Sequence, residues 1–267
     1  MFNSLITVYL RTIMQFDKII PINSLKPYIK YFVVSEAGVE NTFNVLPSTG
    51  MVIGFQYRGK LSHIHDGTEI KLSTAGITGI SDRLKIFKNA AGTGTILVYF
   101  TEMGLAQFTS CPANELFNQS ISLDNIFNQD GVREVEERLA LAKNSLQRIA
   151  VVEKFLLTRL RNIRDDRLIV EAVKLIYQSN GAIKISALAA QLFISQSPFE
   201  KRFRKLVGAS PKKFASIVRF NAVLNQLDGN KSLTDICYEN KFFDQAHFIK
   251  DFKLFTGSTP QNFQRSR

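Results

Sequence analysis

Amide and cationic side chains recur at matched positions in the C-terminal part of this 267-residue sequence. The matched pairs, each 49 residues apart, are Gln196 and Gln245, Lys201 and Lys250, and Arg204 and Lys253. A glutamine amide can form two hydrogen bonds with adenine, and arginine or lysine can donate to guanine O6 and N7. Flexible lysines also contact phosphates without selecting a base sequence. The pairs therefore indicate two copies of a set of side chains that is suited to binding a nucleic acid.

An apolar pattern with the same offset must position these side chains. The motif F-x3-F-x4-G-x-[ST]-P-x2-F occurs twice in the sequence. Its residues are Phe199, Phe203, Gly208, Pro211 and Phe214 in the first copy, and Phe248, Phe252, Gly257, Pro260 and Phe263 in the second. Five coincident positions at one offset predict two copies of a single supersecondary unit.

Each copy has the features of a helix-turn-helix. In the first, a short apolar helix over 185–192 is followed by Ser195 as an N-cap, and Phe199, Phe203 and Leu206 form a buried stripe that ends at Gly208. The outer face of the predicted second helix carries Gln196, Ser197, Glu200, Lys201, Arg204 and Lys205. This combination predicts a helix that enters the major groove of DNA.

The second copy repeats this arrangement with different outer residues. Leu233, Ile236 and Cys237 form the core of its first helix, and Asp244 is the predicted cap. The outer face of its second helix carries Gln245, Ala246, Ile249, Lys250 and Lys253. His247 lies in the capping turn, where it either faces DNA or packs against the domain. Because the two outer faces differ, we expect an asymmetric pair of half-sites.

A longer helix joins the two units. Ser210 and Pro211 start it, and residues 228–230 end it. Roughly 16 residues at about 1.5 Å each give a rod of about 24 Å, which can hold two helices toward major-groove segments about 34 Å apart. The lysines that we expect at phosphates are Lys201, Lys205, Lys212, Lys213, Lys250 and Lys253.

Charge is concentrated in the same part of the chain. Residues 1–150 hold 14 Lys and Arg against 13 Asp and Glu, whereas residues 151–267 hold 20 against 10. Nearly all of the net charge of +11 therefore lies in the last 117 residues. This asymmetry favours a polyanion-binding part joined to a near-neutral part.

These motifs resemble the AraC-type transcriptional regulators. The similarity spans about residues 168–265. Its carriers are Leu188-Ala189, Ile194-Ser195-Gln196-Ser197, Phe203-Arg204-Lys205, Gly208-Ala209-Ser210-Pro211, Arg219-Phe220-Asn221-Ala222, Phe242-Phe243-Asp244-Gln245-Ala246-His247-Phe248, Phe252-Lys253 and Gly257-Ser258-Thr259-Pro260. The resemblance implies seven helices, with recognition helices at about 196–207 and 244–254. The family usually has Gly in each turn between the paired helices, where this chain has Phe193 and Lys241. Asn240, beside Lys241, tolerates a positive φ at lower cost.

The N-terminal part is predicted to be a β-rich barrel or sandwich. Short β-rich runs at 31–34, 43–46, 51–57, 84–87 and 95–100 are separated by Gly, Pro, Ser and Asn. Apolar residues spaced by three and four then indicate two amphipathic helices, from about 132 and 149, which form either a dimer seam or a layer on the chain's own sheet. The segment from Phe100 to Leu116 resembles the sensing domains that precede such DNA-binding modules.

Two histidines offer a competing chemistry. His63, His65, Glu69 and Gly76 have the H-x-H-x3-E-x6-G spacing of a cupin metal motif, and alternate residues of a strand share a face. The second half of that motif is missing, because the only other histidine is His247. A surface hairpin is the simpler interpretation. A metal-dependent cupin-type enzyme fused to a DNA-binding module is nevertheless the main rival hypothesis.

The sequence thus predicts an α+β multidomain fold: a cupin-like β-rich domain over 14–130, a helical connector over 131–165 and an all-α double helix-turn-helix domain over 166–267. We expect a non-enzymatic, cytoplasmic protein without a cofactor. Double-stranded DNA, RNA polymerase, a small-molecule effector and a second copy of the chain are its candidate partners. Neither a membrane span nor a signal peptide is expected, and Met14 is an alternative start. A second rival is a ligand-free protein whose N-terminal part only dimerises.

Overall fold

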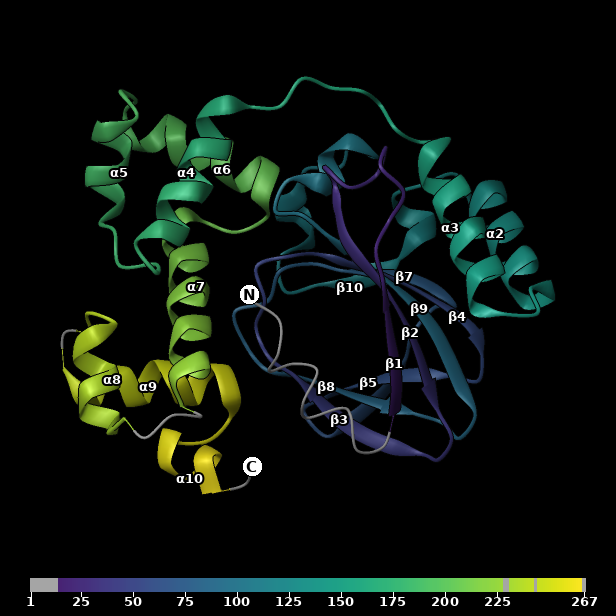
Figure 1. Cartoon of the computed structure of the whole chain (residues 1–267), viewed down its shortest axis with the longest axis horizontal. Coiled ribbons are helices and arrows are strands. Elements are labelled where there is room, and N and C mark those ends of the chain that lie inside the picture. Colours follow the sequence, from purple (N-terminus) through teal and green to yellow (C-terminus); the bar gives the residue numbers. More distant parts are fainter. Residues whose placement is uncertain (1–13, 228–230, 243, 266–267) are drawn as a thin grey trace.

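The structure is a computed structural model that describes residues 14–227, 231–242 and 244–265. A β-rich part lies beside a helical part, and an extended segment after α3 joins them (Figure 1). Residues 1–13, which bear on the alternative start at Met14, lie outside the described residues, as do the expected helix stop at 228–230 and Phe243 of the repeated motif.

A six-stranded antiparallel sheet forms the centre of the β-rich part. In sheet order its strands are β1 (Met14–Ile19), β2 (Ile29–Ala37), β9 (Thr93–Phe100), β4 (Val52–Arg58), β7 (Ala75–Thr78) and β10 (Ser120–Ser122). The apolar alternation along β2, β4 and β9 buries Phe32, Phe55 and Val98 completely. This packed face anchors the rest of the domain.

A smaller antiparallel sheet lies against the first. Its strands, in sheet order, are β3 (Asn41–Val45), β8 (Lys85–Asn89), β5 (Leu61–His65) and β6 (Thr68–Lys71). Among the described residues the two sheets do not close into a ring. The shell is therefore a sandwich, which decides between the two architectures that the sequence left open.

The five predicted strands overlap β2, β3, β4, β8 and β9, and three of them, 43–46, 51–57 and 84–87, extend one residue beyond the observed strand. The hairpin expected around the histidines is β5 with β6. Two helices then follow, α2 (Gln129–Leu141) and α3 (Ser145–Leu157). Their apolar stripes pack on the chain's own sheet, as the edge-to-face contact of Phe155 with Phe55 (5.8 Å between ring centroids) shows. The structure thus favours a layer on the sheet over a dimer seam.

Seven helices make up the C-terminal part of the described chain. They are α4 (Arg167–Gln178), α5 (Ile185–Gln191), α6 (Gln196–Val207), α7 (Pro211–Gln226), α8 (Leu233–Glu239), α9 (Gln245–Thr256) and α10 (Pro260–Arg265). In the described part of the chain, no helix combines the length and apolarity needed to span a membrane.

The repeated phenylalanines build two matching cores. Phe203 contacts Phe199 and Phe214 edge to face, with ring centroids 5.7 and 5.5 Å apart. In the second copy Phe252 contacts Phe248 and Phe263 in the same way, at 5.9 and 5.4 Å. The sequence repeat is thus also a structural repeat, because equivalent rings make equivalent contacts.

Candidate DNA interface

The first recognition helix, α6, is held by its buried face and its ends. Phe199, Phe203 and Val207 are fully buried, and Gly208 ends the helix at φ +99°. Ser195 occupies the N-cap position, as predicted, but its side chain makes no capping hydrogen bond. Pro198, the third residue of the helix, has no N–H, so one of the two usual donors to an N-cap oxygen is missing.

The outer face of α6 carries the polar residues that the sequence singled out. Gln196, Ser197, Lys201, Arg204 and Lys205 are exposed. Glu200 lies at the centre of this face, where it accepts hydrogen bonds from Gln196 Nε2 (2.9 Å) and Arg204 Nη2 (3.4 Å). Glu200 therefore aligns two candidate base-contacting side chains in one row, a role that its residue type alone did not reveal.

The second recognition helix, α9, has the predicted cap. Asp244 Oδ1 accepts a hydrogen bond from the His247 N–H at 2.6 Å, and Gly257 ends the helix at φ +76°. The His247 ring is half-exposed and lies beside Phe242 and Asp251, so it both packs and faces solvent. The predicted contact residues Gln245, Lys250 and Lys253 are exposed.

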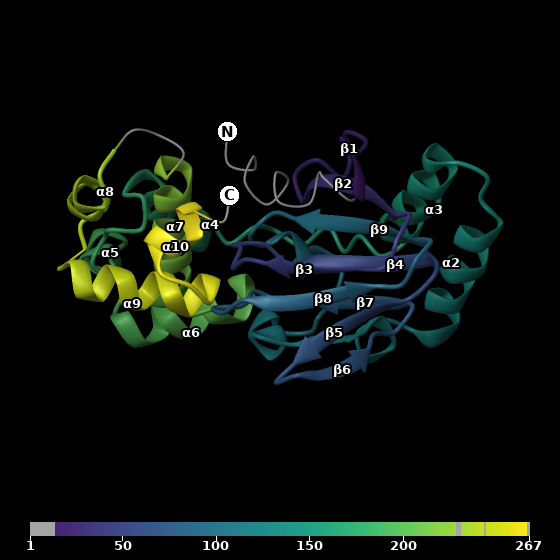
Figure 2. The same ribbon diagram turned by 90° about the horizontal axis from the view of Figure 1, so that it is seen from below.

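The two recognition helices lie beside opposite ends of α7 (Figure 1) and on the same side of the helical part (Figure 2). Helix α7 has 16 residues, as expected, and the Ser210 hydroxyl caps it by accepting from the Lys213 N–H. Gln196 and Gln245 are both exposed, one on each of these two helices.

The turns between the paired helices are left-handed in both copies. Phe193 has φ +53° and Lys241 has φ +54°, although both carry a Cβ atom. Asn240 does not take the positive φ in place of Lys241, because it is part of the core: its amide donates to Gln226 Oε1 (2.6 Å) and to the Ile236 carbonyl (2.8 Å).

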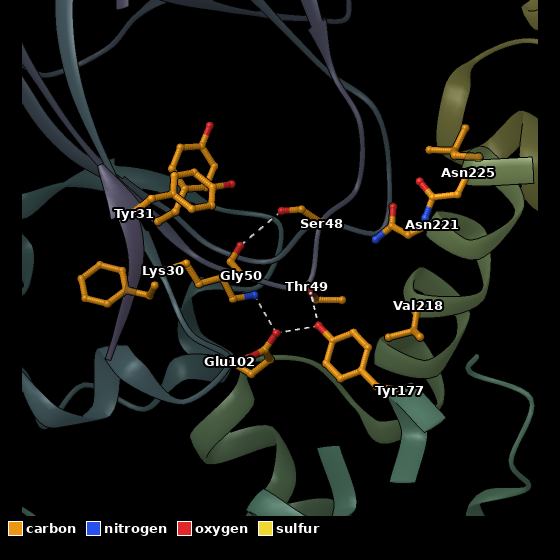
Figure 3. A pocket seen from close by; sticks show the side chains of 13 residues that line it. Lys30, Tyr31, Ser48, Thr49, Gly50, Glu102, Tyr177, Val218, Asn221 and Asn225 are labelled. Carbon is orange, nitrogen blue, oxygen red and sulfur yellow. Dashed lines mark hydrogen bonds and ion pairs between the residues drawn. The ribbon is translucent and has the colours of Figure 1, made fainter. Parts of the chain in front are cut away.

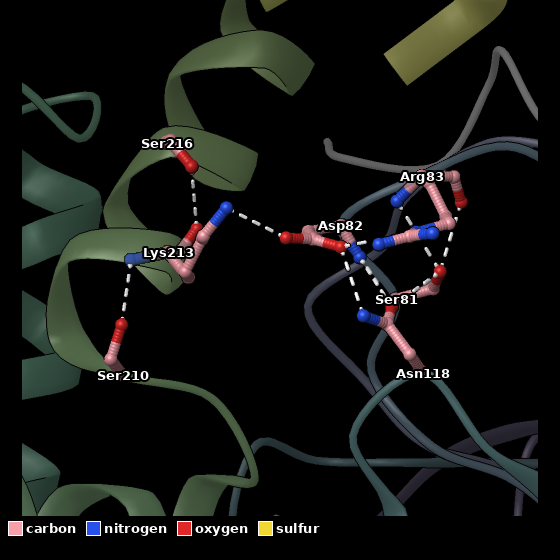
Figure 4. A network of polar contacts seen from close by, with 7 residues as sticks. All are labelled: Ser81, Asp82, Arg83, Asn118, Ser210, Lys213 and Ser216. Atoms are coloured by element: carbon pink, nitrogen blue, oxygen red, sulfur yellow. Dashed lines mark hydrogen bonds and ion pairs between the residues drawn. The ribbon is translucent and has the colours of Figure 1, made fainter. Parts of the chain in front are cut away.

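One candidate phosphate ligand has a different partner. Lys213 Nζ lies 2.7 Å from Asp82 Oδ2, in the loop before β8 (Figure 4). Asn118 Nδ2 donates to the same carboxylate at 3.0 Å. Burial raises the pKa of Asp82, but the hydrogen bonds from Lys213 and Asn118 outweigh burial and leave the pKa below its usual value. Lys213 thus joins the two parts of the chain.

The candidate metal ligands are not brought together. His63 and His65 share a face of β5, and their rings stack at 5.9 Å. Glu69, however, pairs in register with Ile64 and not with either histidine, so it lies on the opposite face of the sheet, where Lys88 contacts it. No group of three or more metal-ligating residues occurs within the described ranges.

A cavity of about 310 Å³ lies between the β-rich and helical parts (Figure 3). On its floor, Glu102 accepts from Lys30 Nζ (2.7 Å) and from the Tyr177 hydroxyl (2.5 Å). Burial and the neighbouring Glu102 raise the pKa of Tyr177. Asn221 and Asn225 of α7 form the facing wall.

A second cavity, of about 230 Å³ and mostly apolar, lies between the two sheets. The sequence did not reveal the interdomain cavity.

Two family models match the chain. Residues 188–266 match a helix-turn-helix domain, and residues 17–122 match a domain of unknown function, DUF6597. The Msm operon regulatory protein of Streptococcus mutans is 26% identical over 157 residues, which cover 57% of this chain and 56% of that protein. An uncharacterized HTH-type transcriptional regulator of Staphylococcus aureus is 29% identical over 86 residues, covering 32% of this chain and 12% of that protein. The chain thus spans about half the length of the first relative and a small part of the second.

Among solved structures, ToxT from Vibrio cholerae is similar with a TM-score of 0.47 and 11% identity, over 95% of this chain and 98% of that one. The C-terminal domain of AraT from Geobacillus stearothermophilus has a TM-score of 0.37 and 18% identity, over 39% of this chain and 89% of that one. The family match and the sequence relatives confirm the resemblance that the repeated motif indicated. The C-terminal part of the chain is thus an AraC-type helix-turn-helix domain, and a β-rich part precedes it.

Proposed function

We propose that the chain is a sequence-specific DNA-binding regulator of transcription, in which α6 and α9 enter two consecutive major-groove segments. The observation that carries this proposal is the exposure of Gln196 and Gln245 on matching helices at opposite ends of α7. The relatives named as an operon regulatory protein and as an HTH-type transcriptional regulator support it. The chain acts by binding, and no observation favours the rival enzyme.

The side chains divide into two roles. Gln196, Gln245 and Arg204 can contact base edges, because a planar amide or guanidinium forms paired hydrogen bonds with adenine or guanine. The lysines position the helices on phosphates. These lysines are Lys201, Lys205, Lys250 and Lys253, all of them exposed. Ser195, Ser197, Asp244 and His247 lie at the helix starts, where the first turn of a recognition helix approaches the bases.

Glu200 gives the first half-site a distinct preference. Its carboxylate accepts from both Gln196 and Arg204, and a carboxylate can also accept from the cytosine N4 amino group. The equivalent residue of α9 is Ile249, which is exposed and apolar and can contact only a methyl group of thymine. We therefore propose that the two helices recognise different base sequences.

The β-rich part is proposed to control this binding. The cavity between the two parts, of about 310 Å³, is within the size range of small-molecule sites, and it borders α7, which joins the two recognition helices. The apolar cavity between the two sheets is smaller, at about 230 Å³. A second copy of the chain and RNA polymerase are the proposed protein partners, in the cytoplasm. The boundaries 14–130, 131–165 and 166–267 remain predictions.

The test is in vitro selection of duplexes from a random pool by the full chain, followed by binding measurements at several salt concentrations. The proposal expects an enriched duplex with two unlike half-sites about one helical turn apart. It also expects that Arg204→Ala weakens binding to duplexes that carry the preferred base at the position contacted by Arg204. Binding to duplexes with another base at that position should not change. Enrichment of no sequence at all, with equal affinity for every duplex, would contradict it.

A further inference from the structure

A buried lysine borders the cavity between the two sheets. Lys85 of β8 is only 6% exposed, and its Nζ donates to Ser120 Oγ and to the Gln119 carbonyl, each at 3.1 Å. Ser120 lines the cavity, as do Val45 and Phe87. Val45 is the cross-strand partner of Lys85, and Phe87, two residues along β8, shares its face of the sheet. The Lys85 amine therefore lies directly behind the cavity wall.

This amine has no counter-charge. Both acceptors of Lys85 are neutral oxygens, and no ion pair joins it to a carboxylate within the described ranges. Burial alone lowers the pKa of Lys85 to about 8. Burial and the charge of Lys85 also lower the pKa of His63 on β5, so His63 is neutral at neutral pH. Because a buried ammonium without a counter-ion is costly, this position favours the neutral, nucleophilic amine.

The cavity itself suits a small apolar molecule. Its volume of about 230 Å³ corresponds to roughly eight heavy atoms, at about 30 Å³ for each water-sized group. Phe43, Val52 and Leu97 are among the side chains that make its walls apolar. Ile70 and Lys71 of β6 also line the cavity and are exposed. A ligand can therefore enter at this edge of the smaller sheet.

Two hydroxyl groups connect the amine to the cavity. Ser120 Oγ accepts from Lys85 Nζ and lies 3.1 Å from Thr78 Oγ1, and both Ser120 and Thr78 line the cavity. Because Ser120 accepts from the lysine, its own hydrogen is available to donate, either to Thr78 or to an oxygen atom of a ligand. The polar end of the cavity can thus hold a carbonyl oxygen close to the amine.

We propose that Lys85 forms an imine with a small apolar aldehyde that enters the cavity between the two sheets. The neutral Nζ attacks the carbonyl carbon, and the oxygen takes a proton from the nitrogen to give a carbinolamine. The hydroxyl group then leaves as water with the remaining proton of the nitrogen, whose lone pair completes the C=N bond. No oxidant or reductant is needed. Lysines desolvated in apolar pockets are the nucleophiles used for this chemistry.

The experiment exposes the wild-type full chain briefly to heptanal at pH 7 with sodium cyanoborohydride, which reduces an imine to a stable secondary amine. Peptide mapping by mass spectrometry then gives the heptyl incorporation at each lysine. At pH 7 a pKa of about 8 leaves about a tenth of the Lys85 amine neutral, against less than about a thousandth for an ordinary lysine. We therefore expect Lys85 to react roughly tenfold or more faster than the exposed Lys71.

Two controls separate the cavity from general lysine reactivity. Glyceraldehyde, a polar aldehyde, should modify exposed lysines without preference for Lys85, and excess heptan-1-ol should protect Lys85 from heptanal. Lys85→Met should lose the fast adduct, whereas Lys88→Met, on the other face of β8, should keep it. Modification of Lys71 with Lys85 unmodified, or no protection by heptan-1-ol, would overturn the proposal. The readout involves no DNA, so either result leaves the proposed function to its own test.

Discussion

Phe193 and Lys241 occupy equivalent turns in the two repeated units, and both have left-handed backbone conformations, at φ +53° and +54°. Such a conformation costs an L-residue about 1–2 kcal/mol, because its Cβ atom crowds the following carbonyl oxygen. The Phe193 side chain is 98% exposed, so burial of the ring does not offset this cost. The geometry of the helix-turn-helix imposes this conformation on both residues.

Phe193→Gly should therefore stabilise the chain. We expect the free energy of unfolding to rise by about 0.5–1 kcal/mol, since strain relief exceeds the added backbone entropy of glycine in the unfolded state. Denaturation in urea measures the change. Phe193→Ala is the control, because it removes the ring and keeps the Cβ atom. An equal gain from Ala and Gly would show that the ring, and not the backbone, is the source of the strain.

Lys201→Ala and Arg204→Ala should differ in how they weaken DNA binding. Both residues are exposed on α6, but lysine is assigned to a phosphate and arginine to a base. Lys201→Ala should weaken binding to all duplexes alike and lower the slope of log affinity against log salt by about 1. Arg204→Ala should cost about 1–3 kcal/mol on the enriched duplex alone. Titrations at four salt concentrations distinguish them; identical effects of the two substitutions would refute the assignment.

Lys85 should make stability depend on alkaline pH. Burial lowers the pKa of this lysine from 10.5 to about 8 in the folded chain, where it donates to Ser120 Oγ and the Gln119 carbonyl. Between these two pH values the unfolded chain binds more protons, so the free energy of unfolding should rise as pH increases from about 8 to about 10.5. Below pH 8 both states are protonated and this gain is absent.

Lys85→Met should remove that rise and add about 1–3 kcal/mol to the free energy of unfolding at pH 7, because no buried ammonium remains. The control is Lys88→Met, on the other face of β8, where Lys88 pairs with Glu40 and Glu69 near the surface. That variant should keep the wild-type pH dependence. If the Lys85→Met variant also kept the wild-type pH dependence of stability, a group other than Lys85 would have to cause that dependence.

Tyr177→Phe should weaken the contact between the two parts of the chain. Its hydroxyl donates to Glu102 at 2.5 Å and lies 2.7 Å from Thr49 Oγ1, so its loss leaves buried acceptors with fewer partners. We expect a loss of about 1–3 kcal/mol in the free energy of unfolding. Tyr238→Phe is the matched control, because Tyr238 is 75% exposed, and it should change stability little. Comparable losses from the two would argue against the buried network.

The recognition helices could be predicted from the sequence almost to the residue. The expected range of α6, 196–207, is the observed one, because caps, turn residues and a phenylalanine stripe are local signals. Strands β7 and β10 were not identified, and β10 has only three residues, too few to show an alternating pattern. β6 is exposed along its whole length, so it carries no apolar alternation either.

The partners of individual site residues could be predicted only in part. Lys213 was assigned to phosphate because sequence alone shows its place at a helix start, whereas its partner Asp82 comes from a distant loop. Glu200 lies one turn from both Gln196 and Arg204, so helical spacing could have indicated its role. The metal hypothesis was weakened by strand register, which places Glu69 opposite Ile64 and which residue spacing does not reveal.

The most direct test places a DNA-cleaving iron chelate on each recognition helix in turn. Gln196→Cys and Gln245→Cys, made in a chain whose Cys111 and Cys237 are replaced by serine and alanine, carry the reagent to the enriched duplex. If both helices enter the major groove, we expect two separate cleavage clusters on one face of the duplex, centred about 10 base pairs apart. Cleavage by only one of the two chains, or clusters on opposite faces of the duplex, would contradict it.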